Sequence, residues 1–496
     1  MESTVKPALR LMAGRGVAMM ATFIAPLVLV RLFDQAQFGT YKQLFLVYGT
    51  LYNIAQVGMA ESLFYFLPRA VRPAGGYVAN AMLTLGAAGL AGLLLLWAGA
   101  PAMARWLGNP ALAGHLPRLG LFLMLMLPSA ALEIVMIGCR RYSWGAISYG
   151  VSDVLRALAL IVPALAWRSL DGLLAGAAVF AAVRLVAAAV YFRREFDGEL
   201  RPRAGLEWAQ LAYALPFALT VLVDTVQLSY HQYAVAHRFD AATFAVYSVG
   251  CFQVPLMELV ASPLANVMMV RMAERLRDGR GDAALAVWTR TTRTLALIFF
   301  PVLAILLVSA RDLIALLFTE SYLASVPIFM VWSLALGASV LQTDAVLRVY
   351  AATRFMLVAG IVKLTMIAAL IALFISAFGL PGAVIVSLVA MLTLKAAALV
   401  RMRSFFGVGL GRVAPWRDLA RIATAATAAA LPALAVRAVV PGPLLVRLAL
   451  TGLAGGGAYL TILFQAGLLD RSEREAVSAW WQRFIPRVAA AGESGS

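Results

Sequence analysis

Apolar stretches of about 20 residues recur along the whole chain, and this is the length a helix needs to cross a hydrocarbon core of about 30 Å. Hydrophobic residues make up 62% of the chain and charged residues only 13%, against roughly 25% charged in soluble proteins. The apolar stretches are continuous rather than alternating, which excludes a transmembrane β-barrel. The sequence therefore predicts an all-α membrane protein.

Pro, Gly and charged residues divide the apolar stretches, so that about 14 transmembrane helices can be placed. We place them at 9–32, 42–66, 77–99, 117–138, 145–167, 172–192, 209–234, 242–268, 293–310, 326–347, 355–378, 380–400, 417–439 and 443–468. The first is interpreted as an uncleaved helix, because its apolar stretch is too long for a signal peptide.

The net charge of +17 follows from where the cations lie relative to the membrane. With this segmentation, Lys and Arg favour one side of the membrane by about three to one, which predicts that both termini are cytoplasmic. No cluster of basic and aromatic residues suits single-stranded nucleic acid, so a nucleic-acid partner is not expected.

A nine-residue pattern occurs twice. Phe33-Asp34-x-Ala36-x-Phe38-x-x-Tyr41 returns 206 residues later as Phe239-Asp240-x-Ala242-x-Phe244-x-x-Tyr247, and Arg140-x-Tyr142 returns 208 residues later as Arg348-x-Tyr350. An even number of spans separates the two copies, so the repeat is predicted to be parallel. We expect two parallel six-helix lobes and two further segments, with bounds 1–206, 207–412, 413–469 for the last two helices, and 470–496 for a cytoplasmic amphipathic tail.

Within the repeated pattern, Asp34 and Asp240 each follow one apolar stretch and precede the next. An Asp in this position commonly accepts hydrogen bonds from the first N–H groups of the following helix. We therefore interpret both as helix caps, with substrate contact as the alternative, and expect the aromatic residues of the pattern to anchor the helices at the membrane interface.

Charges inside the spans are the candidate functional residues, because a charge at the bilayer centre costs several kcal/mol unless it faces protein or water. Two cations near one repeat offset, Arg156 and Lys363, would form a site for an anionic headgroup, with Arg184 and Lys395 as a second pair. The acidic residues Asp224, Glu258 and Asp344 are candidates for ion coupling.

Structural pairing is the alternative for these charges, since Asp153 and Arg156 are three residues apart and Asp344 and Arg348 are four apart on a helix. Lys395 lies close enough to the cytoplasmic interface for its ammonium group to reach water.

Signals for catalysis or cofactors are weak. The chain has no phosphate-binding Gly-x-x-x-x-Gly-Lys loop, its three histidines are scattered, and its two cysteines suggest neither a disulfide framework nor a metal site. No cofactor and no metal are therefore expected. The loops are short, so an enzyme with a separate catalytic domain is not expected.

Two segments resemble a known family. Val30–Tyr41 and Gln56–Arg69 are similar to the start and the second helix of bacterial polysaccharide biosynthesis flippases, in the multidrug/oligosaccharidyl-lipid/polysaccharide exporter superfamily. Asp34 departs from the Gly common at its position, and Glu61 is unusual in the second span. The resemblance in motif covers roughly residues 9–72, and the helix count and repeat extend it over the chain.

The resemblance implies a transporter that moves an undecaprenyl-diphosphate-linked oligosaccharide, or the lipid-linked peptidoglycan precursor, across the bacterial inner membrane by alternating access. Its expected partners are the lipid-linked glycan and membrane lipids, and other polysaccharide-assembly proteins are candidates. A multidrug or cation antiporter of the same superfamily is an alternative, favoured by a cavity of net negative charge. A membrane polymerase or glycosyltransferase is a second alternative.

Overall fold

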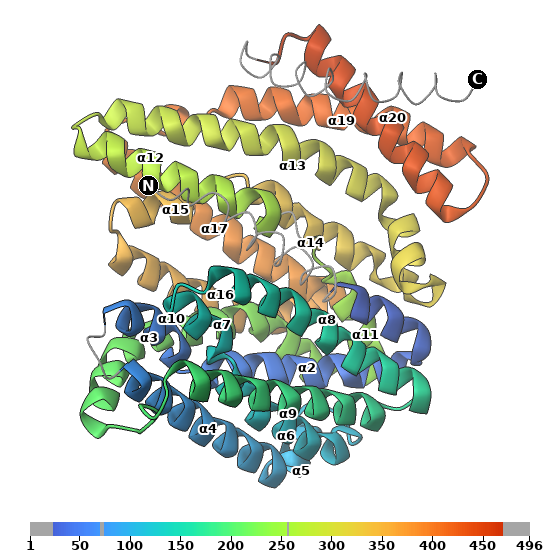
Figure 1. Ribbon diagram of the computed structural model, residues 1–496. Helices are drawn as coiled ribbons and strands as arrows, with labels where there is room; N and C mark the ends of the chain where they lie inside the picture. The colour runs from blue at the N-terminus through green and yellow to red at the C-terminus, as the bar shows by residue number, and fades with distance from the viewer. Residues whose placement is uncertain (1–22, 70–73, 255–256, 470–496) are drawn as a thin grey trace, which may run out of the picture. The chain divides into compact units, whose positions relative to one another are not determined.

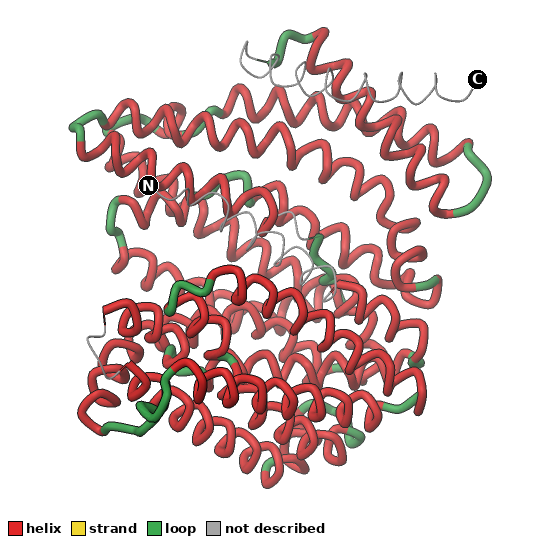
Figure 2. Tube along the Cα trace, viewed as in Figure 1, coloured by secondary structure: helices red, strands yellow, loops and turns green. Residues whose placement is uncertain are grey.

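The computed structural model describes residues 23–69, 74–254 and 257–469. Within these ranges every regular element is helical and no strand occurs, as Figure 2 shows. The all-α prediction is therefore confirmed. The amphipathic tail predicted at 470–496 lies outside the described residues.

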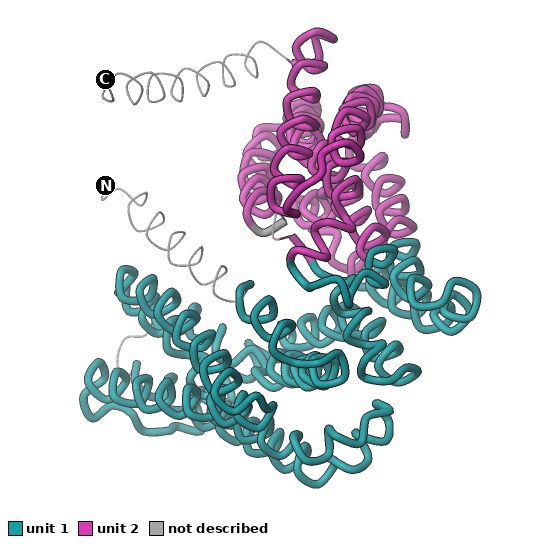
Figure 3. Tube along the Cα trace, turned by 90° about the vertical axis from the view of Figure 1, so that its right-hand side faces the viewer, with its two compact units in different colours: residues 1–252, 317–328, 357–390 teal, residues 253–316, 329–356, 391–496 magenta. Residues whose placement is uncertain are grey.

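The chain divides into two compact units (Figure 3), which are described separately. Unit 1 comprises Met1–Phe252, Leu317–Ile328 and Leu357–Ala390. Its described helices, labelled in Figure 1, are Phe23–Leu32, α2 (Gln35–Ala55), α3 (Met59–Phe66), η1 (Leu67–Arg69), α4 (Ala74–Ala98), α5 (Ala100–Trp106), α6 (Leu112–Ser129), α7 (Ala131–Gly138), α8 (Tyr142–Trp167), α9 (Leu170–Glu195), α10 (Ala204–Arg238), α11 (Ala241–Gly250), η3 (Glu320–Ser325) and most of α16 (Thr353–Phe378).

Unit 2 comprises Gln253–Leu316, Phe329–Met356 and Met391–Ser496. Its helices, wholly or in large part, are η2 (Met257–Ala261), α12 (Ser262–Arg277), α13 (Gly281–Phe318), α14 (Val326–Ala338), α15 (Thr343–Val349), α17 (Leu380–Phe406), α18 (Leu410–Val413), α19 (Trp416–Val439) and α20 (Leu444–Gln465). The units follow spatial contacts, whereas the predicted lobes follow a sequence repeat, so the lobe boundaries stay a prediction.

Eleven helices of the described residues are long and apolar enough to cross a membrane, and each overlaps one predicted span. The first predicted span lies mainly outside the described residues. The second is divided between α2 and α3, where Val57 and Gly58 both have positive φ, and the eighth is divided between α11 and α12. The chain is a multi-pass membrane protein, and the total of fourteen spans stays a prediction.

The two copies of the repeated pattern begin their helices in the same way. Asp34 caps α2 with φ −67° and ψ 171°, and Asp240 caps α11 with φ −69° and ψ 170°. Asp34 Oδ1 accepts from the Gln37 N–H at 2.8 Å, and Asp240 Oδ1 accepts from the Thr243 N–H at 3.0 Å. The capping interpretation is confirmed for both residues.

Most aromatic residues of the pattern are core residues rather than interface anchors. Phe38, Tyr41, Phe244 and Tyr247 are all buried within unit 1. The reason is that α2 packs along α11, which brings the two copies of the pattern together. For these four rings the expectation that they anchor the helices at the membrane interface was wrong.

Gly39 sets how closely α2 and α11 approach. A Cβ added at this position would lie 1.7 Å from the backbone oxygen of Ala241, so only glycine fits without separating the two helices. Gly49 on the same helix has open space around it, with nothing within 4 Å of an added Cβ. The two glycines therefore differ in role although both lie in α2.

A constant offset of 211 residues relates the helices and turns within residues 108–168 to those within residues 319–379. Tyr142 begins α8 and Thr353 begins α16, 211 residues on (353 less 142), and both helices contain 26 residues. Residues with positive φ recur at the same offset, in the pairs Gly108 and Thr319, Arg140 and Ala351, and Arg168 and Gly379.

The repeat of Arg140-x-Tyr142 as Arg348-x-Tyr350, 208 residues later, does not mark equivalent positions in the structure. Arg140 follows helix α7, whereas Arg348 lies inside α15. The local structure matches Arg140 with Ala351 instead, because both are the left-handed residues that end a helix.

We expect Gly39→Ala to destabilise the protein by about 1–3 kcal/mol, because α2 and α11 must separate to admit the new methyl group. Gly49→Ala is the matched control and should be neutral or stabilise α2 by up to about 1 kcal/mol. Thermal unfolding of both variants in detergent micelles measures the difference. Equal melting temperatures would contradict the close approach at Gly39.

Hydrogen bonds from the Thr243 hydroxyl and backbone N–H hold the pKa of the Asp240 carboxyl below its usual value. Ionised Asp240 therefore stabilises the fold above the unfolded-state pKa of about 4, and this contribution is lost as the pH falls through the lower folded-state pKa. Asp240→Ala should cost ~1 kcal/mol at neutral pH.

The advantage of the wild type over Asp240→Ala should shrink below about pH 4. Asp240→Asn keeps an acceptor for the cap without an ionisable group, so its stability should lack this pH dependence. Melting temperatures of the three proteins across this pH range test the expectation. An advantage of the wild type over Asp240→Ala that is unchanged at about pH 3 would contradict it.

Candidate functional site

Arg184 on α9 lies in a polar cluster that joins α9 to three other helices, α6, α7 and α8. Its guanidinium donates to Glu133 Oε2 on α7 at 2.6 Å and to Ser129 Oγ at 3.2 Å, and it also hydrogen bonds to Ser152 on α8. Glu133 is 1% exposed and accepts a further bond from Ser148 Oγ at 2.8 Å. Both charges are therefore satisfied inside unit 1, at the junction between α6 and α7.

Lys395 occupies the corresponding position in the later helices, since it follows Arg184 by 211 residues (395 less 184). Its Nζ donates to the backbone oxygen of Leu341 at 2.6 Å, in the break between α14 and α15. The two cations predicted as a second pair thus share one structural role, because each one hydrogen bonds at a break in a preceding span.

Arg156 on α8 forms an ion pair with Asp153, one turn earlier on the same helix, at 2.8 Å. The Arg156 side chain is 31% exposed and the Asp153 side chain 24%. This is the ion pair within one helix that the three-residue spacing of Asp153 and Arg156 predicts. Because both groups are accessible, an anion can compete with Asp153 for the guanidinium, unlike at the buried Arg184.

Lys363 on α16 is half-buried and lies near enough to His231 of α10 to interact electrostatically with it. The constant offset matches Lys363 with Ser152, and Arg156 with Ile367. The prediction that Arg156 and Lys363 are equivalent in depth is therefore off by four residues (367 less 363), which is about one helical turn.

Of the three acidic candidates for ion coupling, the two whose side chains the structure describes are not buried. Asp224 on α10 and Asp344 at the start of α15 are both exposed. Glu258 lies in η2, and its side chain is outside the part of the chain that the structure describes.

Lys42 on α2 is a cation that the sequence analysis did not single out. Its Nζ lies 5.4 Å from the centre of the Phe38 ring and 5.7 Å from that of Tyr41, within the range of a cation–π interaction with each ring. An aromatic row continues along α2 through Phe45, Tyr48 and Tyr52. The alternating spacing of three and four residues between these rings could have predicted from the sequence that they share one face of a helix with Lys42.

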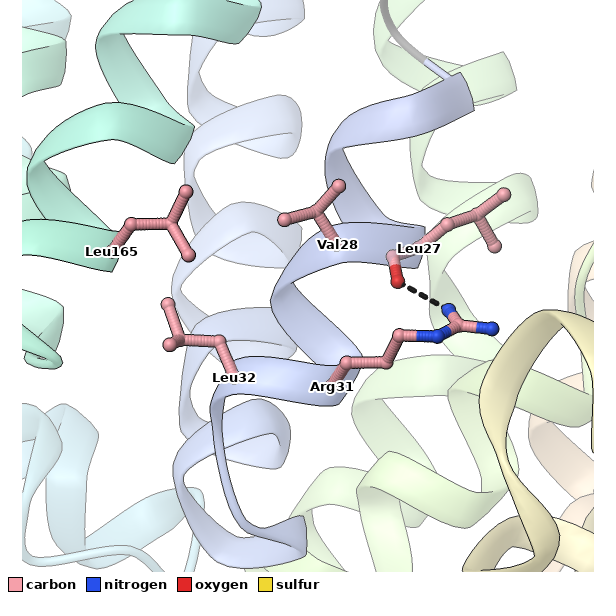
Figure 4. Close-up of a pocket in the computed structure, with 5 residues that line it drawn as sticks. All are labelled: Leu27, Val28, Arg31, Leu32 and Leu165. Atoms are coloured by element: carbon pink, nitrogen blue, oxygen red, sulfur yellow. Dashed lines mark hydrogen bonds between the residues drawn. The ribbon is translucent and has the colours of Figure 1, made fainter.

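A pocket of about 390 Å³ lies between the helix Phe23–Leu32 and α8 in unit 1. Figure 4 shows Val28 and Leu32 turned toward Leu165, with Arg31 on the other side of its helix. Arg31 donates to the backbone oxygens of Leu27 at 2.6 Å and Leu317 at 2.7 Å. The walls are otherwise aliphatic, which suits a hydrocarbon chain rather than a polar headgroup.

The charges of unit 2 include a clamp around Asp312 of α13. Arg447 of α20 donates to Asp312 Oδ1 at 2.6 Å and Oδ2 at 3.1 Å, and Arg437 of α19 donates to Oδ2 at 2.9 Å. The side chain of Asp312 is 5% exposed. These arginines therefore hold the last two helices against α13.

Long apolar helices with paired charges between them define a polytopic membrane protein. The sequence pattern of the family described as "Polysaccharide biosynthesis protein" matches residues 28–327, and the chain belongs to that family. No curated protein matches the chain by sequence.

Solved structures with the same fold are those of flippases and transporters. The lipid II flippase MurJ, in an inward closed conformation, superposes with a TM-score of 0.69 at 12% identity, over 91% of this chain and 99% of its own. An inward-facing multidrug resistance MATE transporter of the MOP superfamily gives a TM-score of 0.59 at 14% identity, over 80% and 98%. A MOP superfamily transporter from Pyrococcus furiosus, whose binding pocket has reversed polarity, gives 0.52 at 14%, over 81% and 95%.

We expect Arg184→Ala to cost about 3–5 kcal/mol of stability, because it leaves the Glu133 carboxylate buried without its partner. The double variant Glu133→Gln with Arg184→Gln should recover part of the loss. Arg156→Ala is the control and should cost no more than about 0.5 kcal/mol, since its pair with Asp153 is accessible. Melting temperatures in lipid nanodiscs test this order, and a double variant less stable than Arg184→Ala would contradict it.

Proposed function

We propose that the protein moves an undecaprenyl-diphosphate-linked oligosaccharide from the inner to the outer leaflet of the bacterial cytoplasmic membrane, for polysaccharide biosynthesis. Membership of the polysaccharide biosynthesis family is the observation that carries the proposal. The fold shared with MurJ, whose name states that it flips lipid II, supports a lipid-linked substrate.

Transport would proceed by alternating access of two lobes, residues 1–206 and 207–412, with both termini in the cytoplasm. Two helices within 413–469 complete the fold. The distribution of Lys and Arg supports this orientation. The energy source would be an ion gradient or the membrane potential, with Asp224, Glu258 and Asp344 as coupling candidates.

In this proposal Arg156 and Lys363 bind the diphosphate. The planar guanidinium of Arg156 can donate two parallel hydrogen bonds to phosphate oxygens, and Lys363 contributes a point charge. Asp153 would hold Arg156 in place until the substrate arrives. Arg184 and Lys395, the second candidate pair, would shape the site by fixing the helix breaks at which they hydrogen bond.

The test is flipping in proteoliposomes that contain an undecaprenyl-diphosphate oligosaccharide with a fluorescent glycan. Dithionite, which quenches only the outer leaflet, reports the movement of the label. We expect the double variant Arg156→Ala with Lys363→Ala to lose at least about tenfold in rate, because two charge-assisted contacts are removed. Arg354→Ala, at an exposed position on α16, is the matched control and should keep the wild-type rate.

Full activity of the double variant would rule out the assigned roles of Arg156 and Lys363. Wild-type protein that moves a cationic dye but no lipid-linked glycan would overturn the proposed function in favour of a multidrug antiporter. Lipid scrambling in liposomes without protein serves as the baseline.

A further inference from the structure

The aromatic row of α2, formed by Phe45, Tyr48 and Tyr52, is separate from the charges assigned above. The ring centres of Phe45 and Tyr48 are 5.8 Å apart, and those of Tyr48 and Tyr52 are 5.5 Å apart with the two rings stacked. Spacings of three and four residues place the three rings on one face of the helix. Buried Phe122 of α6 stacks on Tyr48 with ring centres 4.6 Å apart, which fixes the orientation of that tyrosine.

The face of α2 that carries the row is open. All three rings are half-buried, whereas Tyr41, one turn before Phe45, is 5% exposed. Gly49 follows Phe45 by four residues and precedes Tyr52 by three, so it lies on the same face. A Cβ added at Gly49 would meet no atom of the described residues within 4 Å. The glycine therefore leaves room for a ligand to approach the backbone between the rings.

The two hydroxyl groups of the row indicate a polar environment rather than lipid. Tyr48 and Tyr52 lie within the predicted span 42–66, and Tyr52 is close to its middle. In the part of the chain that the structure describes, neither hydroxyl forms a hydrogen bond with another residue. A hydroxyl without a hydrogen bond is costly in hydrocarbon, so this face is expected to border water or a polar ligand.

Lys42 lies at the end of the row that is nearer the Asp34 cap. It precedes Phe45 by three residues and is half-buried. Its Nζ is near the rings of Phe38 and Tyr41, and among the described residues no carboxylate pairs with it. An ammonium group has three N–H donors, which at Lys42 are available to water or to a ligand on the same face.

The fold of the repeated pattern does not require this row. The second copy keeps the buried aromatic residues of the pattern, but 206 residues after the row it has Cys251, Val254 and Glu258. Helix α11 ends at Gly250, whereas α2 continues to Ala55. Rings that only packed the shared structure would be expected in both copies, and the row belongs to the first copy alone.

Aromatic rings, hydroxyls and one ammonium group on a single open face match the surface of a sugar. A pyranose has C–H groups on its faces, which pack on aromatic rings, and hydroxyls around its edge, which form hydrogen bonds. An isoprenoid chain would also pack on the rings, but it would leave the tyrosine hydroxyls and the ammonium group without partners.

We propose that this face of α2 is a glycan subsite. Sugar rings of the substrate stack on Phe45, Tyr48 and Tyr52, and Lys42 donates a hydrogen bond to a sugar oxygen at one end of the row. Gly49 provides the space in which a sugar ring lies. That the occupant is the glycan of a lipid-linked substrate rests on the proposed function, whereas the capacity of the row to bind sugar rings does not.

Saturation-transfer NMR tests the subsite without transport. The probe is the soluble tetramer of N-acetylglucosamine, added to the protein in lipid nanodiscs, with empty nanodiscs as the baseline. Irradiation of aromatic protons should give signals at the sugar C–H protons. Tyr48→Leu with Tyr52→Leu should reduce these signals at least about threefold, because the rings are lost. Tyr48→Phe with Tyr52→Phe should retain them, because the rings remain.

Transport of two labelled lipids separates the glycan from its carrier. One is undecaprenyl diphosphate with a fluorescent tetramer of N-acetylglucosamine, and the other carries the fluorophore on a linker without sugar. Gly49→Leu fills the open space and should slow the first lipid about tenfold more than the second. Gly457→Leu, at another glycine with open space, on α20, is the matched control and should leave both rates unchanged.

The two measurements distinguish the subsite from the proposed function. A wild type that gives no more saturation transfer than the double leucine variant would overturn the subsite, as would equal slowing of both lipids by Gly49→Leu. A wild type that binds the tetramer through the row but moves neither lipid would overturn the proposed function and support the subsite. Melting temperatures equal to that of the wild type show that the variants are folded.

Discussion

The close contact between α2 and α11 is the constraint on which the arrangement of unit 1 depends. Gly39 lets the backbone of α2 approach Ala241, and membrane helices gain most from such contacts because lipid offers no hydrophobic force between them. The contact buries Phe38 and Tyr41 of the first copy of the pattern and Phe244 and Tyr247 of the second. It also carries Tyr247 into the core, where it meets His231.

Polar groups inside the spans obey a second constraint, that hydrocarbon cannot satisfy them. Arg184 and Lys395 both hydrogen bond at breaks between helices, and Asp312 receives two arginines. Such charges fix the shape of the bundle. Arg156 differs because its ion pair with Asp153 is partly exposed, and an anion can therefore compete for its guanidinium.

Much of the local structure could be predicted because it depends on neighbours in sequence. The Asp34 and Asp240 caps and the Asp153 pair each involve residues three positions apart, and eleven apolar stretches became long helices. The offset that relates the later helices of the two halves could not be predicted from the sequence. Two short repeated patterns do not show where the turns between helices lie. Left-handed residues such as Arg140 and Ala351 locate them, and these are visible only in the structure.

By itself the sequence determined the class of protein, since long apolar stretches with few charges can satisfy their backbone in a membrane only as helices. It also determined the caps and the family resemblance. Tertiary structure alone decided which polar side chains meet: Arg184 with Glu133, fifty-one residues away, and His231 with Tyr247. Those partners depend on how helices cross, and crossing is set by packing between distant residues such as Gly39 and Ala241.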